Sequence, residues 1–215
     1  MIIVFGGKKH GSGKTTMVTN LSVMRAEKGH NVLLIDANVP QCTATYWNRL
    51  RDGLKIKPSI FYTQKSGRLD DEIIQLSKKF DDIIIDTGGE DTKELRSSML
   101  VADYTYVPLQ PSQFDMWTIE KMADLVKSSQ ELNLQLKASV ILNRASTNPR
   151  VSEINEAKES LKNLNNALNF SQAIIRDRIA FKKAAKNGMA VTEIKPADKK
   201  AIKEMKLLYQ EIYHD

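Results

Sequence analysis

The segment IIVFGGKKHGSGKTT, residues 2–16, most constrains the fold, because an apolar strand, a glycine-rich loop and the start of a helix follow one another directly. Glycines allow the loop backbone to turn sharply and to direct its N–H groups inward. The N-terminus of the following helix adds partial positive charge at the same point. This order is typical of a loop that wraps phosphate groups at the edge of a parallel sheet. The segment therefore predicts a nucleotide-binding α/β protein.

Each residue type in the loop suits one part of a nucleotide and its metal. Backbone N–H groups surround the phosphates, a lysine ammonium reaches the β and γ phosphates, and a threonine hydroxyl binds Mg²⁺. The residues expected to contribute are Gly11, Ser12, Gly13, Lys14, Thr15 and Thr16, with Lys14 as the catalytic cation and Thr15 as the metal ligand. ATP and Mg²⁺ are the expected cofactors.

Two further apolar strands end in a carboxylate. NVLLID (31–36) ends in Asp36, and DIIID (82–86) ends in Asp86. Because the carboxyl ends of parallel strands lie along one edge of a sheet, both side chains are expected beside the glycine loop. A carboxylate at a strand end can hold Mg²⁺ through water, and Asp86 is the predicted metal residue.

Short β-branched runs alternate with helical patterns along most of the chain, which predicts a single-domain α/β fold with a mostly parallel sheet and helices on both faces. The expected strands are 2–5, 31–36, 82–86, 104–109 and 138–143, with shorter ones at 59–62 and 173–176. The expected helices are 14–28, 69–79, 92–102, 114–130, 150–164, 178–187 and 197–213. No linker or internal repeat divides the sequence, so residues 1–215 are expected to form one domain.

Composition narrows the cellular setting. No apolar run reaches the length of about 18 residues that a membrane span needs, and the N-terminal residues lack the layout of a signal peptide. The single cysteine, Cys42, cannot form an internal disulfide or supply a cysteine-rich metal site. A cytoplasmic protein is expected.

Positive charge is concentrated near the C-terminus. Residues 176–206 contain ten Lys or Arg and four Asp or Glu, a surplus of six that equals the net charge of +6 for the whole chain. The final helix is expected to bury an apolar stripe and to expose lysines. The expected stripe is Ala201, Ile202, Met205, Leu208, Tyr209 and Ile212; the lysines are Lys199, Lys200, Lys203 and Lys206. These lysines form either a solvated face or a surface for a polyanion.

Several motifs together resemble those of the ParA/MinD family of P-loop ATPases. KHGSGKTT (9–16) resembles the family's deviant phosphate loop, LLIDANVPQCTATYW (33–47) its switch I strand and loop, and IIIDTGG (83–89) its magnesium strand and switch II. ADYTYVPLQPSQFDMW (102–117) and IIRDRIAFKKAAKNGMAVTE (174–193) resemble later family segments. The resemblance covers nearly the whole chain. It is strongest to short plasmid-partition ParA proteins of the ParF-like type, which lack an N-terminal DNA-binding extension.

The resemblance implies roles for residues that spacing alone does not assign. Lys9 occupies the position of the signature lysine, which contacts the partner's phosphates across an ATP-dependent homodimer. Asn143 and Arg144 fall where the family contacts adenine. Asn38 stands where the family commonly has a second switch I carboxylate, so Asp36 becomes the candidate for positioning the attacking water. Slow hydrolysis without a partner is expected.

The implied function is plasmid or chromosome partition. In this hypothesis the ATP-bound dimer binds non-specific DNA through the C-terminal basic residues, a small ParB/ParG-like centromere-binding protein stimulates hydrolysis, and the protein is nucleoid-associated with no membrane contact. Two alternatives stay open. One is a MinD-like membrane-associated positioning ATPase with a basic amphipathic tail helix. The other is a P-loop metabolic ligase.

Overall fold

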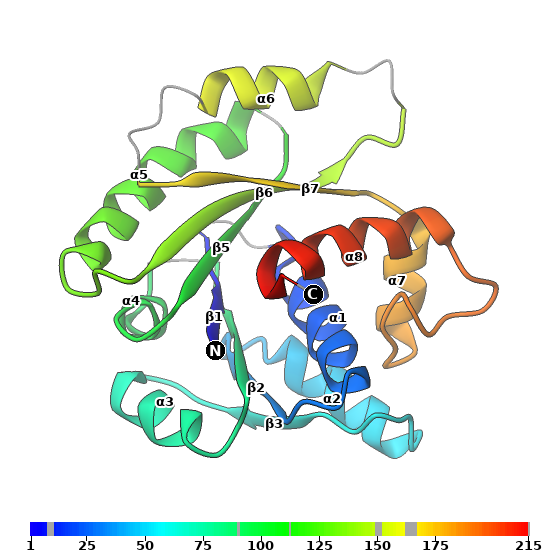
Figure 1. Cartoon of the computed structure of the whole chain (residues 1–215). Coiled ribbons are helices and arrows are strands. Elements are labelled where there is room, and N and C mark those ends of the chain that lie inside the picture. Colours follow the sequence, from blue (N-terminus) through cyan, green and yellow to red (C-terminus); the bar gives the residue numbers. More distant parts are fainter. Residues whose placement is uncertain (8–10, 90, 112, 149–151, 162–166, 215) are drawn as a thin grey trace.

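The computed structural model describes residues 1–7, 11–89, 91–111, 113–148, 152–161 and 167–214. Its centre is a seven-stranded sheet of order β3-β2-β4-β1-β5-β6-β7, in which every neighbouring pair is parallel (Figure 1). The strands are β1 (Ile2–Phe5), β2 (Val32–Ala37), β3 (Phe61–Gln64), β4 (Asp82–Thr87), β5 (Tyr104–Leu109), β6 (Lys137–Ala145) and β7 (Asn169–Arg176). The α/β fold with a parallel sheet is therefore as predicted.

Helices cover both faces of this sheet (Figure 1). They are α1 (Lys14–Glu27), α2 (Thr43–Gly53), α3 (Asp70–Ser77), α4 (Lys93–Met99), α5 (Gln113–Gln130), α6 (Glu153–Leu161), α7 (Ile179–Lys186) and α8 (Lys199–Tyr213). One core contains side chains of α1, α2, α7 and α8, and the other contains side chains of α3, α4, α5 and α6. Successive strand residues point to opposite faces, so Ile84 joins the first core while Ile83 and Ile85 join the second.

Helix α2 differs from the expectation for residues 33–47, which is a strand followed by a loop. Its N-cap residue, Cys42, makes no side-chain capping bond and has a left-handed φ of 47°. The cap comes instead from Asp36: the backbone N–H of Thr45 donates to Asp36 Oδ2 at 2.7 Å. A cap supplied from the end of the preceding strand leaves no local signal of the kind that usually marks a helix start.

The other differences lie at element ends. Strand β3 begins two residues later than expected, since the parallel pairing of Leu33 with Phe61 sets its register on β2. Strand β7 is longer at its N-terminal end than the predicted 173–176. The apolar stripe of α8 is confirmed: Ala201, Met205, Leu208, Tyr209 and Ile212 are buried, and Ile202 packs against the same core. Among the helices of the described ranges, none has the length and apolar character needed to cross a membrane.

Candidate functional site

Strands β1, β2 and β4 bring the predicted site residues to one edge of the sheet. Asp36 on β2 is in register with Asp86 on β4, and Asp86 in turn is in register with Phe5, the last residue of β1 before the glycine loop. Helix α1 begins just beyond that loop, and its Thr15 Oγ1 donates to Asp86 Oδ2 at 2.5 Å. The expected adjacency of the loop and the two carboxylates is thus present.

Asp86 has the properties of a cation-binding carboxylate. The side chain is completely buried, and its Oδ1 has no hydrogen-bond partner among the described residues. Burial raises the pKa of Asp86 to about 7, with Asp36 adding to the rise and the bonds and charges of Thr15 and Lys14 opposing it. A buried carboxylate oxygen beside a threonine hydroxyl supplies hard oxygen ligands of the kind that Mg²⁺ prefers. The residues present therefore fit the metal that the sequence predicts.

Lys14 is positioned as a buried cation at the start of α1. Only 5% of it is exposed. Burial lowers its pKa, and the nearby charge of Asp86 partly offsets that effect. The N-cap residue of α1 is Gly13, which has no side chain to accept hydrogen bonds from the N–H groups of the first helical turn. A dianionic phosphate bound at this point would meet both the positive charge of Lys14 and the N–H groups of the first helical turn.

The glycine loop is held from behind by Asn143. The buried Asn143 side chain donates through Nδ2 to the carbonyl oxygen of Ser12. Gly13 has a φ of 95°, and a Cβ built at this position would lie 2.1 Å from Asn143 Nδ2. Glycine is therefore required at position 13 for both conformation and space. In this structure Asn143 orients the loop, a role that its position in the sequence alone does not show.

A cavity of about 130 Å³ lies beside the loop. Gly13, Thr16, Asn143 and Arg144 line one side of it. The other side comes from the end of β7 and from α7, including Asp177, Arg178 and Phe181. The cavity brings both residues predicted for adenine contact next to the phosphate loop, together with an RDR sequence (176–178) that had no assigned role. The sequence signal for these residues is their position at the end of a strand, at the ligand-binding edge of the sheet.

Asp36 is engaged by the backbone of switch I. Its Oδ1 accepts from the N–H of Asn38 at 3.2 Å, and its Oδ2 accepts from the N–H of Thr45 at 2.7 Å. The side chain has no exposed surface. Asp36 thus orients the switch I segment and the start of α2, and any effect on a water molecule is expected to pass through that segment.

Asn38 extends from switch I toward switch II. Its Oδ1 is buried without a hydrogen-bond partner among the described residues, and it lies 3.4 Å from the position that a Cβ on Gly88 would occupy. The next residue, Val39, is exposed. A buried acceptor without a partner is costly unless a ligand or water completes it.

Lys9 lies outside the described residues, so its predicted role in the partner's site stays a prediction. Of the remaining loop residues, Ser12 is buried, and its hydroxyl has no hydrogen-bond partner within the described ranges; Gly11 has a φ of 72°. The carbonyl oxygen of Thr16 accepts from Asn20 Nδ2 at 2.7 Å. Within the part of the chain that the structure describes, no group of three His, Cys, Asp or Glu side chains forms a metal cluster.

Comparison with known proteins assigns the family. The model of the CobQ/CobB/MinD/ParA nucleotide-binding domain matches residues 3–191. The chain belongs to this family. A curated relative of this ParA/MinD-type protein is the maintenance of carboxysome distribution protein A of Halothiobacillus neapolitanus, 22% identical over 210 residues that cover 95% of this chain and 92% of the relative.

Solved structures show that the whole fold is shared. The ATP complex of a Cyanothece McdA variant has a TM-score of 0.75 at 18% identity, covering 98% of this chain and 95% of that one. A plasmid partition protein of Borrelia burgdorferi bound to AMPPNP has a TM-score of 0.72 at 19% identity, covering 99% of this ParA/MinD-type chain and 98% of that one. The protein therefore has the nucleotide-binding ATPase fold of its family.

Proposed function

We propose that this protein is an ATP-dependent partition ATPase that dimerises on ATP, binds DNA without sequence preference and positions a large cargo such as a plasmid. The main support is the arrangement of the phosphate loop, Lys14, Thr15 and Asp86 at one sheet edge. The carboxysome-distribution and plasmid-partition proteins that resemble this chain indicate cargo positioning as the functional class. We place the protein in the cytoplasm, associated with the nucleoid.

In this proposal each site residue has a separate task. Lys14 and the N–H groups of residues 11–16 bind the phosphates, while Thr15 and Asp86 hold Mg²⁺, which supplies charge stabilisation for phosphoryl transfer. Asp36 orients switch I, and Lys9 contacts the partner's phosphates. Asn143 and Arg144 stand beside the cavity for the base. A small centromere-binding protein is proposed to complete the site and stimulate hydrolysis.

The DNA contact is supported by a groove that we call the basic groove. It has a volume of about 890 Å³ and lies between α7, residues 194–198 and the start of α8. Four exposed lysines line it: Lys183, Lys195, Lys199 and Lys200.

The two acidic residues of the basic groove are already engaged in other bonds. Asp198 caps α8 by accepting from the N–H groups of Lys200 and Ala201, and Glu193 is paired with Arg51. By contrast, the four lysines have no ion-pair partner within the described ranges. The basic groove therefore presents a net positive surface suited to a phosphate backbone.

Burial of α8 favours the DNA hypothesis over membrane binding by this helix. A helix that lies in a lipid interface inserts its apolar face among the acyl chains. In α8 the apolar face is Met205, Leu208 and Ile212, all of which are buried in the core between α1 and the sheet. Inserting that face into lipid would require the core to open.

Sedimentation velocity tests the proposal. The protein would be run with ATP plus Mg²⁺, with ADP plus Mg²⁺ and without nucleotide, each with and without random-sequence duplex DNA. We expect a dimer only with ATP, and co-sedimentation with DNA mainly in that state. A monomer under all conditions, or DNA-free protein in every nucleotide state, would contradict the proposal. Parallel flotation with anionic vesicles distinguishes the membrane alternative.

A further inference from the structure

The connection between α7 and α8 contains a short segment that contacts two helices of the nucleotide site. We call residues 188–193 the junction segment. Gly188 has a φ of 63°, and a Cβ built on it would lie 2.8 Å from the backbone nitrogen of Arg51 on α2. The junction segment and α2 are thus in backbone contact at a position that only glycine allows.

Arg51 joins the junction segment to α2. The arginine is completely buried, and its guanidinium donates to both carboxylate oxygens of Glu193 at 2.7 and 2.8 Å and to the carbonyl oxygen of Gly188 at 3.0 Å. Trp47, one turn earlier in α2, donates to the carbonyl oxygen of Met189 at 3.4 Å. A two-pronged arginine–carboxylate pair fixes orientation as well as distance. The start of the same α2 is bonded to Asp36, so one short helix connects switch I to the junction segment.

Asn20 joins the junction segment to α1. The N–H of Val191 donates to Asn20 Oδ1 at 2.7 Å, and Asn20 Nδ2 donates to the carbonyl oxygen of Thr16 at 2.7 Å. The Asn20 side chain is buried. A single amide therefore connects the first turn of the phosphate-loop helix to the middle of the junction segment.

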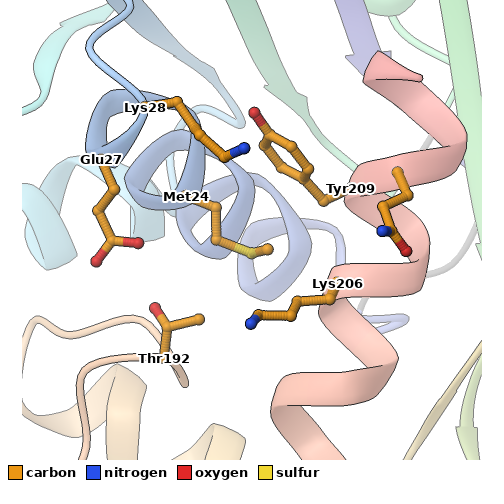
Figure 2. A pocket seen from close by; sticks show the side chains of 7 residues that line it. Met24, Glu27, Lys28, Thr192, Lys206 and Tyr209 are labelled. Atoms are coloured by element: carbon orange, nitrogen blue, oxygen red, sulfur yellow. The ribbon is translucent and has the colours of Figure 1, made fainter. Parts of the chain in front are cut away.

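The other side of the junction segment borders the basic groove and a cavity beside α8. Glu193 lines the basic groove. Thr192 faces a separate cavity of about 430 Å³ between the end of α1 and α8, opposite Lys206 (Figure 2). The pKa of Glu27, which lines that cavity, is raised, mainly by burial and then by the charge of Glu193. The charges of Arg51 and Lys206 partly oppose this rise. Charges on α1, α2 and α8 thus act on one another around this segment.

We infer that the junction segment couples the nucleotide site to the basic groove, with Arg51 and Glu193 as the positioning residues. Close-packed interiors transmit displacements, so a shift of α1 or α2 on nucleotide binding moves the junction segment and, with it, the groove lysines on either side of it, Lys183 and Lys195. The coupling is reciprocal, so a polyanion in the groove changes nucleotide affinity by the same factor. This inference rests on the proposed function, because it needs a polyanion that binds the groove.

The test compares the affinity for DNA in two nucleotide states. The dissociation constant of random-sequence duplex DNA would be measured by fluorescence anisotropy with ADP plus Mg²⁺ and with a slowly hydrolysed ATP analogue plus Mg²⁺. The variants are Arg51→Lys, which keeps the charge but loses the two-pronged geometry, Glu193→Gln and Asn20→Ala. Arg68→Lys is the matched control, because Arg68 makes a two-pronged pair with Asp70 but is exposed.

In the wild type, we expect DNA to bind more tightly with the ATP analogue. The ratio of the dissociation constant with ADP to that with the ATP analogue should therefore be above one. In Glu193→Gln, Arg51→Lys and Asn20→Ala this ratio should fall by about tenfold. In Glu193→Gln and Arg51→Lys, nucleotide affinity without DNA should stay within about twofold of wild type. If the pair only stabilises the fold, its loss would lower the unfolding temperature and leave the ratio unchanged. Folded variants with the wild-type ratio would overturn the inference and leave the proposed function standing. Wild-type protein that binds no DNA in either state would overturn both.

Discussion

Gly13 is the residue of the site whose surroundings leave the least freedom. Its positive φ and the adjacent Asn143 amide together exclude a side chain. Lys14 and Thr15 follow it directly, so their positions at the start of α1 depend on its backbone conformation. The chemistry expected of these two residues is therefore inseparable from the glycine before them.

Replacing Gly13 with alanine should weaken ATP binding by at least about tenfold, since a left-handed conformation costs a non-glycine residue about 1–2 kcal/mol before the overlap with Asn143 is added. Titration with a fluorescent ATP analogue measures the effect. Gly53→Ala is the control, because a Cβ at Gly53 meets nothing within 4 Å. Equal affinity of Gly13→Ala and wild type would show that the loop does not bind nucleotide in this conformation.

Asn38 sets a second prediction at this scale. An amide can accept and donate hydrogen bonds, but it brings no negative charge to the metal and the attacking water. Asn38→Asp should raise basal hydrolysis by about 10²-fold, the size typical of one electrostatic contact in a transition state. Phosphate release at saturating ATP is the measurement.

Asn169→Asp serves as the control for the Asn38 variant, because Asn169 is exposed at the start of β7.

Asp36→Ala should abolish turnover and keep ATP affinity. Full activity in Asp36→Ala would show that switch I is not oriented through this carboxylate.

Helices α2 and α8 are both capped by an aspartate, with different consequences for prediction. Asp198 is adjacent to α8 and accepts from the N–H groups of Lys200 and Ala201, so its cap is visible in the sequence. Asp36 caps α2 from nine residues away. The apolar stripe predicts α8 without this cap, whereas α2 has neither an adjacent cap nor a predicted stripe, and its residues are not predicted to form a helix.

Charge reversal on α8 tests the DNA contact of this element. Replacing Lys199, Lys200 and Lys203 with glutamate should weaken binding to duplexes of any sequence and reduce the salt slope by about one unit per lost phosphate contact. The fold should persist, because negative charge in the first turn of a helix is favourable. The matched control carries glutamate at the exposed Lys55, Lys78 and Lys79. If both triple variants lose the same affinity, binding depends on net charge and not on the basic groove.

At the scale of the whole molecule, the family resemblance implies an ATP-dependent dimer in which Lys9 of each subunit contacts the phosphates of the other. Lys9→Ala should bind ATP with nearly wild-type affinity and yet remain a monomer with a slowly hydrolysed analogue, since its expected contact is on the other subunit. Sedimentation velocity and nucleotide titration on the same sample separate the two effects. Lys14→Ala is the comparison variant, which should lose ATP binding and dimer together. A Lys9→Ala protein that dimerises like wild type would remove the proposed role of Lys9 in the partner's site.

The sequence by itself determined the features that depend on neighbouring residues. The β1–loop–α1 unit, the carboxylates at the ends of β2 and β4 and the apolar stripe of α8 all follow from local order and periodicity, and the structure confirms their placement. These features sufficed to predict the α/β fold and the position of the site at one sheet edge.

Only the tertiary structure decided which distant residues complete the site. The bond from Asn143 to Ser12, the cap from Asp36 to α2 and the pair of Arg51 with Glu193 join residues 131, 9 and 142 positions apart. Such partners meet because the sheet order and the packing of helices on it bring their elements together, and no spacing along the chain encodes that meeting. The phosphate loop could therefore be identified from its own residues, whereas the contacts that orient it and connect it to the basic groove required the fold.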